Sequence, residues 1–413
     1  MKASHECDWL ILFVALVLCV IGVATLYSAG HPVRVSGAPV ESVYLQRQLL
    51  WLAVGSVALL LGAVVPFRVY ETLAQVMYAA CVVLLVAVLL LPNRGETQRW
   101  IALGPVNIQP SELAKVGVLF VWARALSGHR GDPNRIRKLV HLLVLFAVPF
   151  LLVLRQPDLG TSLVFPGLLL AMMYWRGFRG IHIIFLLSPF VTSFLIVYGD
   201  MSHNPWPFGV FIVAVFAVAY VRRRRLLESV SLIVANLGIG LAVPVVWNDL
   251  KSYQQTRILN FLDPNVDRLG AGWQVIQSKI AIGSGGFGGK GYLAGTQKAL
   301  EFLPAKHTDF VFSVLGEEMG FVGALVVLSL FAIIVYRALA VAQKCKSEFA
   351  STVCVGIAAY FFLQVAVNVA MTTGMAPVTG IPLPFVSYGG SSLLVSSFLI
   401  GFLLNASARW YEY

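Results

Sequence analysis

The stretch WLILFVALVLCVIGVATLYSA, residues 9–29, contains no charged side chain and decides the class of fold. A helix needs about 20 consecutive apolar residues to cross the hydrocarbon core of a bilayer, and this stretch meets that length. It is not typical of a cleaved signal peptide, because it lacks a basic n-region and an A-x-A-type cleavage site. Residues 9–29 are therefore predicted to be the first membrane-spanning helix.

Further apolar stretches of similar length follow along the chain. They cover residues 47–66, 72–92, 111–127, 138–155, 159–176, 180–199, 206–221, 229–248, 309–339, 350–374 and 384–407. The whole sequence is 58% hydrophobic and 12% charged, whereas soluble domains carry about 25% charged residues. The sequence thus predicts an all-α polytopic membrane protein of about 12 transmembrane helices, with residues 1–413 forming a single integral membrane domain.

The positive charges predict how the chain is oriented. Arg and Lys are concentrated in the loops after the fourth, sixth, eighth and tenth spans, and the loop after the eighth holds the run Arg222–Arg225. Such loops face the cytoplasm by the positive-inside rule. An even number of spans then places both termini in the cytoplasm of a bacterial inner membrane and residues 249–308 outside. The net charge of +11 therefore does not imply a nucleic-acid partner. The arginine run is interpreted as a topology anchor, and the alternative is a site that binds lipid or a protein partner.

Residues 249–308 form a polar, glycine-rich segment between two predicted spans, DLKSYQQTRILNFLDPNVDRLGAGWQVIQSKIAIGSGGFGGKGYLAGTQKALEFLPAKHT. Loops this long inside a compact domain are usually functional or disordered. The segment contains too many apolar and aromatic residues for a disordered tether. We therefore expect a large extracytoplasmic loop that folds onto the membrane surface and carries chemistry.

Two carboxylates of this loop, Asp263 and Asp267, lie four residues apart, and Asp267 is the candidate catalytic group. Asp263 precedes Pro264 and fits a turn. Asp267 lies in a stretch able to display a carboxylate, although a lone carboxylate is more often solvated than catalytic. The run GSGGFG at residues 283–288 matches a nucleotide-binding pattern, but no βαβ context surrounds it and no Ser or Thr follows Lys290. It predicts a flexible surface turn rather than a phosphate cradle.

The segment TQRWIALGPVNIQPSELAKVGVLF leads from an outer loop into the fourth span. Pro110 suits the first turn of a helix, where its missing N–H has no partner to lose. Ser111, Glu112 and Lys115 then share one helix face, because they are three or four residues apart. Ionisable residues inside a membrane are functional candidates by default, and the alternative is a structural ion pair near the interface.

Carboxylates also occur at the edges of two other spans. In RQPDLGTSL, Asp158 can cap the helix that follows or take part in catalysis, and Gly160 permits close approach of a neighbouring segment. In GEEMG, at least one of Glu317 and Glu318 should face protein or a wet cavity rather than lipid. The small residues of PLPFVSYGGSS favour close packing of the last span.

No residue spacing points to a structural metal site. The five cysteines show no CxxC or Cys/His ligand spacing, and the seven histidines are scattered along the chain. No internal repeat is evident either, which argues against a transporter built from inverted repeats.

Together these motifs resemble the SEDS family of cell-wall polymerases, the group of RodA, FtsW and SpoVE. The matching blocks occur in the family's order from about residue 40 to 405, and they are RWIALGPVNIQPSELAK, QPDLGTS, FLDPNVDRLGAGWQVIQSKIAIGSGGFGGKG, LEFLPAKHTDFVFSVLGEEMG and PLPFVSYGGSS. The resemblance implies a SEDS-like helical bundle and a peptidoglycan glycosyltransferase that polymerises lipid II into glycan strands. The wording KIAIGSGG, GTQ and LEFLP favours the elongation branch, RodA, over the division branch, FtsW.

The resemblance also assigns residues and a partner. The family's essential acid falls on Asp267. The family's polar, substrate-binding cavity maps onto Arg47, Trp100, Gln109, Glu112, Lys115 and Asp158. The resemblance implies a class B penicillin-binding protein as the partner, which crosslinks the new strands. It also implies contact with the surrounding membrane lipids. One departure from the family concerns residues 177–248, which supply three spans where the ten-span family has one. We therefore predict a two-helix insertion there, and we assign no family role to any residue in this range.

Glycan polymerisation needs a base for the 4-hydroxyl of the acceptor sugar and charge stabilisation for the departing diphosphate. Asp267 is the predicted base, while Lys115 and Arg47, or a Mg²⁺ or Mn²⁺ ion, would offset the charge; no organic cofactor is expected. Attack opposite an α-linked diphosphate would give a β-linked product by inversion. Two other classes of function stay open. One is a lipid II flippase, although a flippase has little need of a long outer loop. The other is a scaffold that recruits a crosslinking enzyme.

Overall fold

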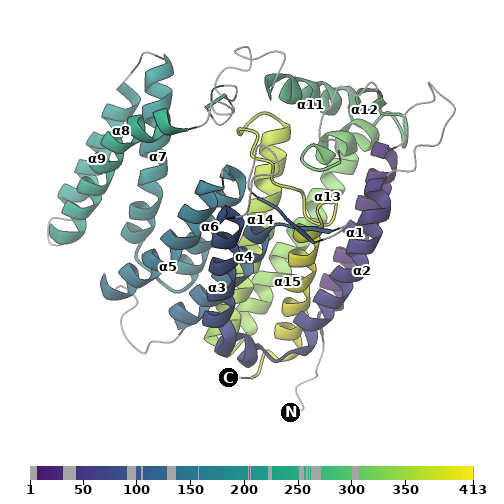
Figure 1. Ribbon diagram of the computed structural model, residues 1–413, viewed down its shortest axis with the longest axis horizontal. Helices are drawn as coiled ribbons and strands as arrows, with labels where there is room; N and C mark the ends of the chain where they lie inside the picture. The colour runs from purple at the N-terminus through teal and green to yellow at the C-terminus, as the bar shows by residue number, and fades with distance from the viewer. Residues whose placement is uncertain are drawn as a thin grey trace.

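The structure is a computed structural model and is almost entirely helical (Figure 1). It describes residues 7–30, 43–90, 99–103, 106–127, 136–156, 158–202, 204, 206–221, 226–250, 255–256, 259, 261, 271–299 and 307–412. The first nine helices are α1 (Trp9–Gly30), α2 (Val43–Val64), α3 (Phe67–Leu90), α4 (Pro110–Ser127), α5 (Ile136–Arg155), α6 (Leu159–Trp175), α7 (Gly180–Ser202), α8 (Trp206–Val221) and α9 (Leu226–Asp249). The later ones are α11 (Ala271–Gly285), α12 (Thr296–Ala299), α13 (Val311–Lys344), α14 (Glu348–Thr372) and α15 (Gly390–Ala408).

One hairpin departs from the all-α expectation. Strands β1 (Ile101–Leu103) and β2 (Val106–Ile108) pair antiparallel, with Ile101 opposite Ile108. β-Branched residues favour extended structure, and this short segment is too brief to form a helix of its own. The hairpin leads directly into α4.

Each predicted apolar stretch coincides with one helix, from α1 to α9 and from α13 to α15. Within the described residues, 8 helices are long and apolar enough to cross a membrane, and α5, α6 and α8 are apolar but contain shorter stretches. Helix α4 is less apolar because it carries Glu112, Lys115 and Arg124. The chain is a multi-pass membrane protein, and twelve as the number of spans stays a prediction.

The centre of the bundle is formed by α4, α14 and α15. Most of α15 is buried, whereas only 17% of the apolar window of α3 is buried, which is the pattern of a helix surrounded by protein and one that faces lipid. Small residues let the neighbouring backbones approach α15 closely. A buried amide then joins the helices, because Asn405 Nδ2 donates to the carbonyl of Gly62 at 3.0 Å and to that of Val65 on the turn after α2.

Helices α7, α8 and α9 form a lateral unit beside the bundle (Figure 1). They pack on one another through a small apolar core of Ile181, Val215 and Leu232. Inside this unit the buried Asn236 accepts from Thr192 Oγ1 at 2.7 Å and donates to Ser188 Oγ at 2.9 Å. The described residues between 177 and 248 thus form a three-helix unit, and its origin as an insertion stays a prediction.

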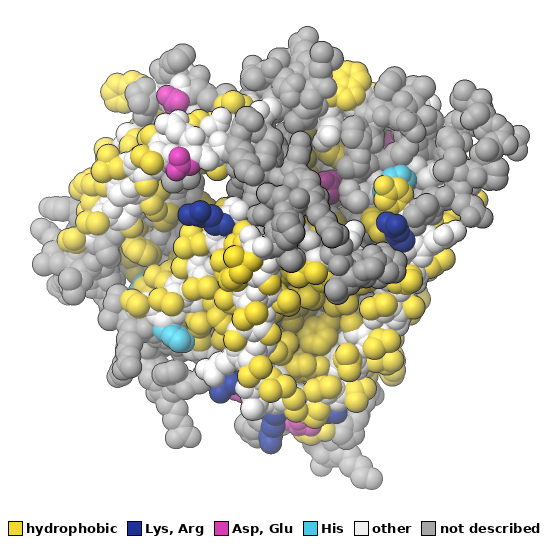
Figure 2. Space-filling view, in the orientation of Figure 1, with side chains coloured by type: hydrophobic (Ala, Val, Ile, Leu, Met, Phe, Trp, Pro, Cys, Tyr) yellow, Lys and Arg dark blue, Asp and Glu magenta, His cyan; other side chains and the backbone are white. Residues whose placement is uncertain are grey.

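The two ends of the bundle differ. Both chain termini lie at one end, here called the terminal end, and α11 and α12 lie at the other, here called the loop end (Figure 1). At the terminal end, Asp8 accepts a hydrogen bond from Arg337 Nε at 2.6 Å. Figure 2 shows a broad apolar band across the visible face of the bundle, with Lys, Arg, Asp and Glu side chains mostly above and below it. This arrangement suits a bilayer that surrounds the bundle between its two polar ends.

Candidate active site

The hairpin and the start of α4 bring the first polar residues of the site together. The backbone N–H of Gln109 donates to Ser391 Oγ on α15 at 2.9 Å, which fixes the end of β2 against the last span. Pro110 occupies the first position of α4, as predicted. The side chains of Gln109 and Ser111 then point toward the start of α6.

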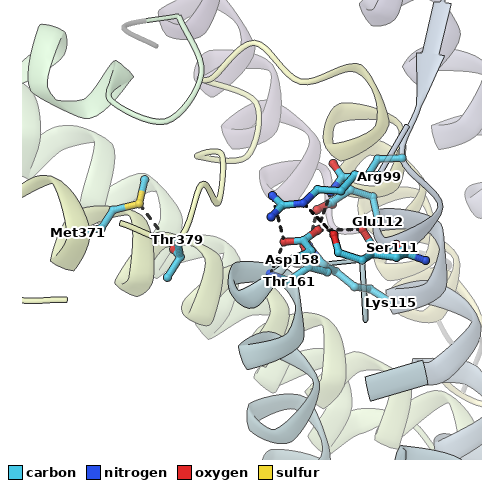
Figure 3. Close-up of polar contacts among 10 residues, drawn as sticks. Arg99, Ser111, Glu112, Lys115, Asp158, Thr161, Met371 and Thr379 are labelled. Atoms are coloured by element: carbon cyan, nitrogen blue, oxygen red, sulfur yellow. Dashed lines mark hydrogen bonds and ion pairs between the residues drawn. The ribbon is translucent and has the colours of Figure 1, made fainter. Parts of the chain in front are cut away.

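Asp158 is the hub of the site, and it is 3% exposed. Its Oδ1 caps α6 by accepting from the N–H of Thr161 at 3.2 Å. Its Oδ2 accepts from Gln109 Nε2 at 2.8 Å and from Ser111 Oγ at 3.2 Å (Figure 3). The capping role and membership of the polar cluster were alternatives in the sequence, and the structure shows that Asp158 has both.

Gly160 explains how the start of α6 reaches this position. A Cβ at residue 160 would lie 2.4 Å from the backbone oxygen of Thr379. Only a glycine therefore allows the segment before α15 to approach so closely. The close approach predicted for Gly160 is confirmed.

Arg99 joins the cluster although it was not among the predicted site residues. Its Nη1 lies 4.0 Å from Asp158 Oδ1, and its Nε donates to the carbonyl of Gln156 at 3.1 Å (Figure 3). The side chain is 15% exposed. Its adjacency to the predicted Trp100 in the matched motif was the only sequence signal that could have indicated it.

Glu112 and Lys115 lie on one face of α4, as their spacing predicted, and they form a buried ion pair, which the sequence had offered as the alternative to a functional role. Lys115 Nζ lies 2.6 Å from Glu112 Oε1, and the two side chains are 1% and 3% exposed. The Lys115 ammonium also lies 5.6 Å from the ring centre of Tyr360. Glu112 neutralises the positive charge of Lys115 inside the protein. The Arg99 side chain is more exposed to solvent than that of Lys115, so Arg99 is the more accessible cation of this cluster.

A deeper polar layer extends this pair toward α14 and α15. Tyr360 lies 3.2 Å from Ser396 through their hydroxyl groups. Glu112 Oε2 and both amide atoms of Gln364 are buried and have no hydrogen-bond partner in the described part of the chain. Buried polar atoms are normally satisfied by protein or water, so this layer suits ordered water or a polar ligand. Residues 360 and 364 share a helix face, which was the signal available in the sequence.

Two predicted cavity residues lie apart from the cluster. Trp100 is 50% exposed beside Arg99. Arg47 is exposed on the second turn of α2, and its neighbour Gln48 is the buried residue, donating to the carbonyl of Ser387 at 3.4 Å. The structure therefore groups Gln109, Glu112, Lys115 and Asp158 but leaves Trp100 and Arg47 at the surface.

The predicted base lies outside the described residues. Asp267 and Asp263 both precede α11, which begins at Ala271. Helix α11 is fixed at its centre, because Ser278 Oγ lies 2.6 Å from Ser313 Oγ and donates to the carbonyl of Thr372 at 2.5 Å. Position 267 is thus four residues from a helix that is anchored on α13 and α14.

The glycine-rich run 283–288 was predicted to be a surface turn, and Gly286 and Gly288 are exposed beyond the end of α11, but residues 283–285 still belong to α11 and Gly285 is buried. The run is also bonded to α13, which the sequence did not indicate. The backbone oxygens of Gly286 and Phe287 accept from the N–H groups of Phe321 and Val322 at 2.9 and 3.2 Å.

The described residues contain no group of three or more His, Cys, Asp or Glu side chains able to hold a metal ion. Gln109, Ser111 and Glu112 offer oxygen atoms of the type that Mg²⁺ prefers, and the same side chains bond to Asp158 and Lys115 through Gln109 Nε2, Ser111 Oγ and Glu112 Oε1. A role for Mg²⁺ or Mn²⁺ stays a prediction.

A lateral groove of about 800 Å³ lies between α1 and α2. It is lined almost entirely by apolar side chains, with Tyr27 and Tyr292 among them. Burial, followed by the charge of Glu318, raises the pKa of the Tyr292 phenol above its ordinary value. Its hydroxyl donates to the carbonyl of Ala24 at 3.0 Å, which attaches the outer loop to α1.

The fold and the cluster define a multi-pass membrane protein with a buried polar site toward the loop end. Comparison with known proteins identifies the family. The FtsW/RodA/SpoVE family model, described as cell cycle protein, matches residues 8–206 and 207–412. The chain belongs to this family.

Individual relatives agree with this assignment. The peptidoglycan glycosyltransferase MrdB of Escherichia coli K12 is 37% identical over 94% of this chain and 90% of its own length. A probable peptidoglycan glycosyltransferase FtsW of Trichlorobacter lovleyi is 33% identical over 98% and 93%. A chain from a solved peptidoglycan synthase complex that coordinates polymerization and crosslinking superimposes with a TM-score of 0.70, at 31% identity and 99% coverage of both chains.

Proposed function

We propose that this protein is a peptidoglycan glycosyltransferase that polymerises lipid II into glycan strands for cell-wall elongation and rod shape. The observation that carries the proposal is the buried cluster of Arg99, Gln109, Glu112, Lys115 and Asp158 at the loop end. Buried ionisable groups within a membrane are costly and mark functional sites. Relatives that match nearly the whole chain are named peptidoglycan glycosyltransferases, which supports the same reaction.

In this proposal the loop end faces outward from the bacterial cytoplasmic membrane, with residues 249–308 extracytoplasmic and both termini cytoplasmic. Lipid II carries its sugars on the outer side at the time of polymerisation, so the site must lie there. The Arg- and Lys-rich loops that follow the even-numbered predicted spans support this orientation through the positive-inside rule.

The proposed reaction is a single displacement at the anomeric carbon of the donor sugar. The carboxylate of Asp267 takes the proton of the acceptor 4-hydroxyl while that oxygen attacks. The bond between the anomeric carbon and the lipid diphosphate breaks, and the diphosphate leaves with its electron pair. Arg99 is the least buried cation of the cluster and is placed to balance the charge of the leaving group, together with Arg47, Lys115 or a divalent cation.

A class B penicillin-binding protein is the proposed partner, since the polymer must be crosslinked and the solved relative belongs to a synthase complex. A division role is the second candidate, favoured by the FtsW relative. Expressing this chain in bacterial cells depleted of their elongation or division polymerase would separate the two roles. Restored rod shape supports elongation, and restored septation supports division.

Purified protein incubated with lipid II in proteoliposomes tests the activity itself. We expect glycan strands, resolved by gel electrophoresis after removal of the stem peptides by an amidase. Transport of lipid II across the vesicle bilayer without any strand formation would instead favour the flippase alternative.

A further inference from the structure

The most unusual backbone of a described span lies in α13. Gly320 has φ 64° and ψ −161°, a conformation that L side chains rarely adopt, and it interrupts the helix. In an uninterrupted helix the N–H groups of Phe321 and Val322 would donate to the carbonyls of Glu317 and Glu318. The interruption frees both carbonyls and both N–H groups inside a predominantly apolar span, where unpaired backbone groups are costly.

The outer loop satisfies all four groups. The carbonyls of Glu317 and Glu318 accept from the N–H groups of Lys290 and Gly291, each at 3.0 Å. The N–H groups of Phe321 and Val322 donate to Gly286 and Phe287 at 2.9 and 3.2 Å. Two helix hydrogen bonds are thus replaced by four bonds to the loop.

The Glu317 side chain adds a second set of bonds to the same loop. Glu317 is fully buried, and its Oε1 accepts from Lys290 Nζ at 2.7 Å and from Thr296 Oγ1 at 2.9 Å. The same oxygen accepts from the N–H groups of Thr296 and Gln297 at 2.8 and 3.1 Å, which fixes the start of α12. The other oxygen, Oε2, accepts from the N–H of Gln297 at 3.3 Å, so both oxygens of this carboxylate are bonded to the loop.

Steric fit makes the arrangement specific. A Cβ on Gly289, where φ is 81°, would lie 2.1 Å from the carbonyl oxygen of Glu318. The glycine-rich run therefore permits the loop backbone to enter the break in α13. Figure 1 shows α11 and α12 side by side over the loop end of α13.

We propose that Glu317 is a positioning residue that holds the outer loop on α13 and thereby places Asp267 at the substrate; this proposal rests on the polymerase function proposed above. The loop segment held by Glu317 follows directly from α11, and Asp267 lies four residues before α11 at its other end. At 1.5 Å per residue the helix is roughly 20 Å long and is anchored at its centre by Ser278, so a tilt of about 10° about that point moves each end by roughly 2 Å. Misplacement by about 1 Å is enough to reduce catalysis by about 10²-fold.

The test uses the full-length protein in nanodiscs and two variants, Glu317→Gln and Lys290→Met. The matched control is Glu348→Gln, which alters an exposed pair with Arg176 at the terminal end. Hydrogen–deuterium exchange of the segment 285–299 reports on the loop. Initial rates with lipid II separate kcat from KM.

We expect Glu317→Gln to raise amide exchange in this segment at least tenfold and to lower kcat at least tenfold, with KM for lipid II changed less than threefold. Lys290→Met should give a smaller effect in the same direction, and the double variant should be no worse than Glu317→Gln alone, because both changes act on one contact. Glu348→Gln should match the wild type. If Glu317→Gln does not fold, Lys290→Met decides the question with the same two measurements.

Unchanged exchange in Glu317→Gln would overturn the proposal, and so would increased exchange with unchanged kcat. Lost turnover with unchanged exchange would indicate a chemical role for Glu317 instead. If the wild type makes no glycan, the proposed function fails, and the positioning role fails with it; exchange would then report only whether Glu317 holds the loop.

Discussion

Replacing Lys115 by Met removes one charge of the buried pair while keeping most of the side-chain length. The partner Glu112 lies 2.6 Å away and is 3% exposed through its side chain, so solvent cannot replace the lost ammonium. Removing one member of a buried pair costs about 3–5 kcal/mol, because the other charge is left uncompensated. We therefore expect Lys115→Met to destabilise the protein by about this amount unless Glu112 takes up a proton.

The double variant Lys115→Met with Glu112→Gln separates the two roles of Lys115. It removes both charges, so most of the lost stability should return. Unfolding by sodium dodecyl sulfate in mixed micelles, followed by circular dichroism, measures the free energy. The matched control is Arg176→Met, whose partner Glu348 is 55% exposed through its side chain, and which should cost at most about 1 kcal/mol.

Lipid II turnover of the same variants then decides what Lys115 does. If Lys115 contacts the diphosphate, turnover stays low in the double variant although stability returns. If the pair is structural, both return together. A loss below about 1 kcal/mol for Lys115→Met, or a double variant no more stable than the sum of the single changes, would refute the reasoning about a buried pair.

Three further predictions address other parts of the molecule. Asp267→Asn should insert and bind lipid II normally but make no glycan strands, and wild-type polymerisation by this variant would rule out its role as the base. In a variant without its native cysteines, a cysteine at position 283 should react with an impermeant maleimide from outside, because Gly283 is exposed with open space around it. A cysteine at position 224, in place of Arg224, should react only from inside. Labelling of position 224 from outside would show that the span assignment around it is wrong. Asn236→Leu should weaken the packing of α7 with α9 by about 0.6–2 kcal/mol, measured as an earlier unfolding step, and an unchanged unfolding curve would mean that its buried hydrogen bonds contribute nothing.

The sequence alone determined the features that depend on neighbours along one helix. Apolar length predicted where each candidate span lies, since the bilayer sets that length for every segment separately. The spacing of Glu112 and Lys115 predicted that they share a helix face, because residues three apart meet on one face of any helix, and it left their ion pair as one of two readings. The cap at Asp158 was predictable for the same reason, since its partner is only three residues away.

The tertiary structure decided which distant segments meet. Gln109 reaches Asp158 and Lys290 reaches Glu317 only because of how the helices and the outer loop pack. The sequence predicted only a surface turn for the glycine-rich run. Nothing in the run itself shows that α13 is interrupted at Gly320 and that this break offers the loop four backbone hydrogen-bond partners. Local preferences fix a helix and its caps, but a contact between segments depends on the packing of the whole bundle, which no single stretch of sequence contains.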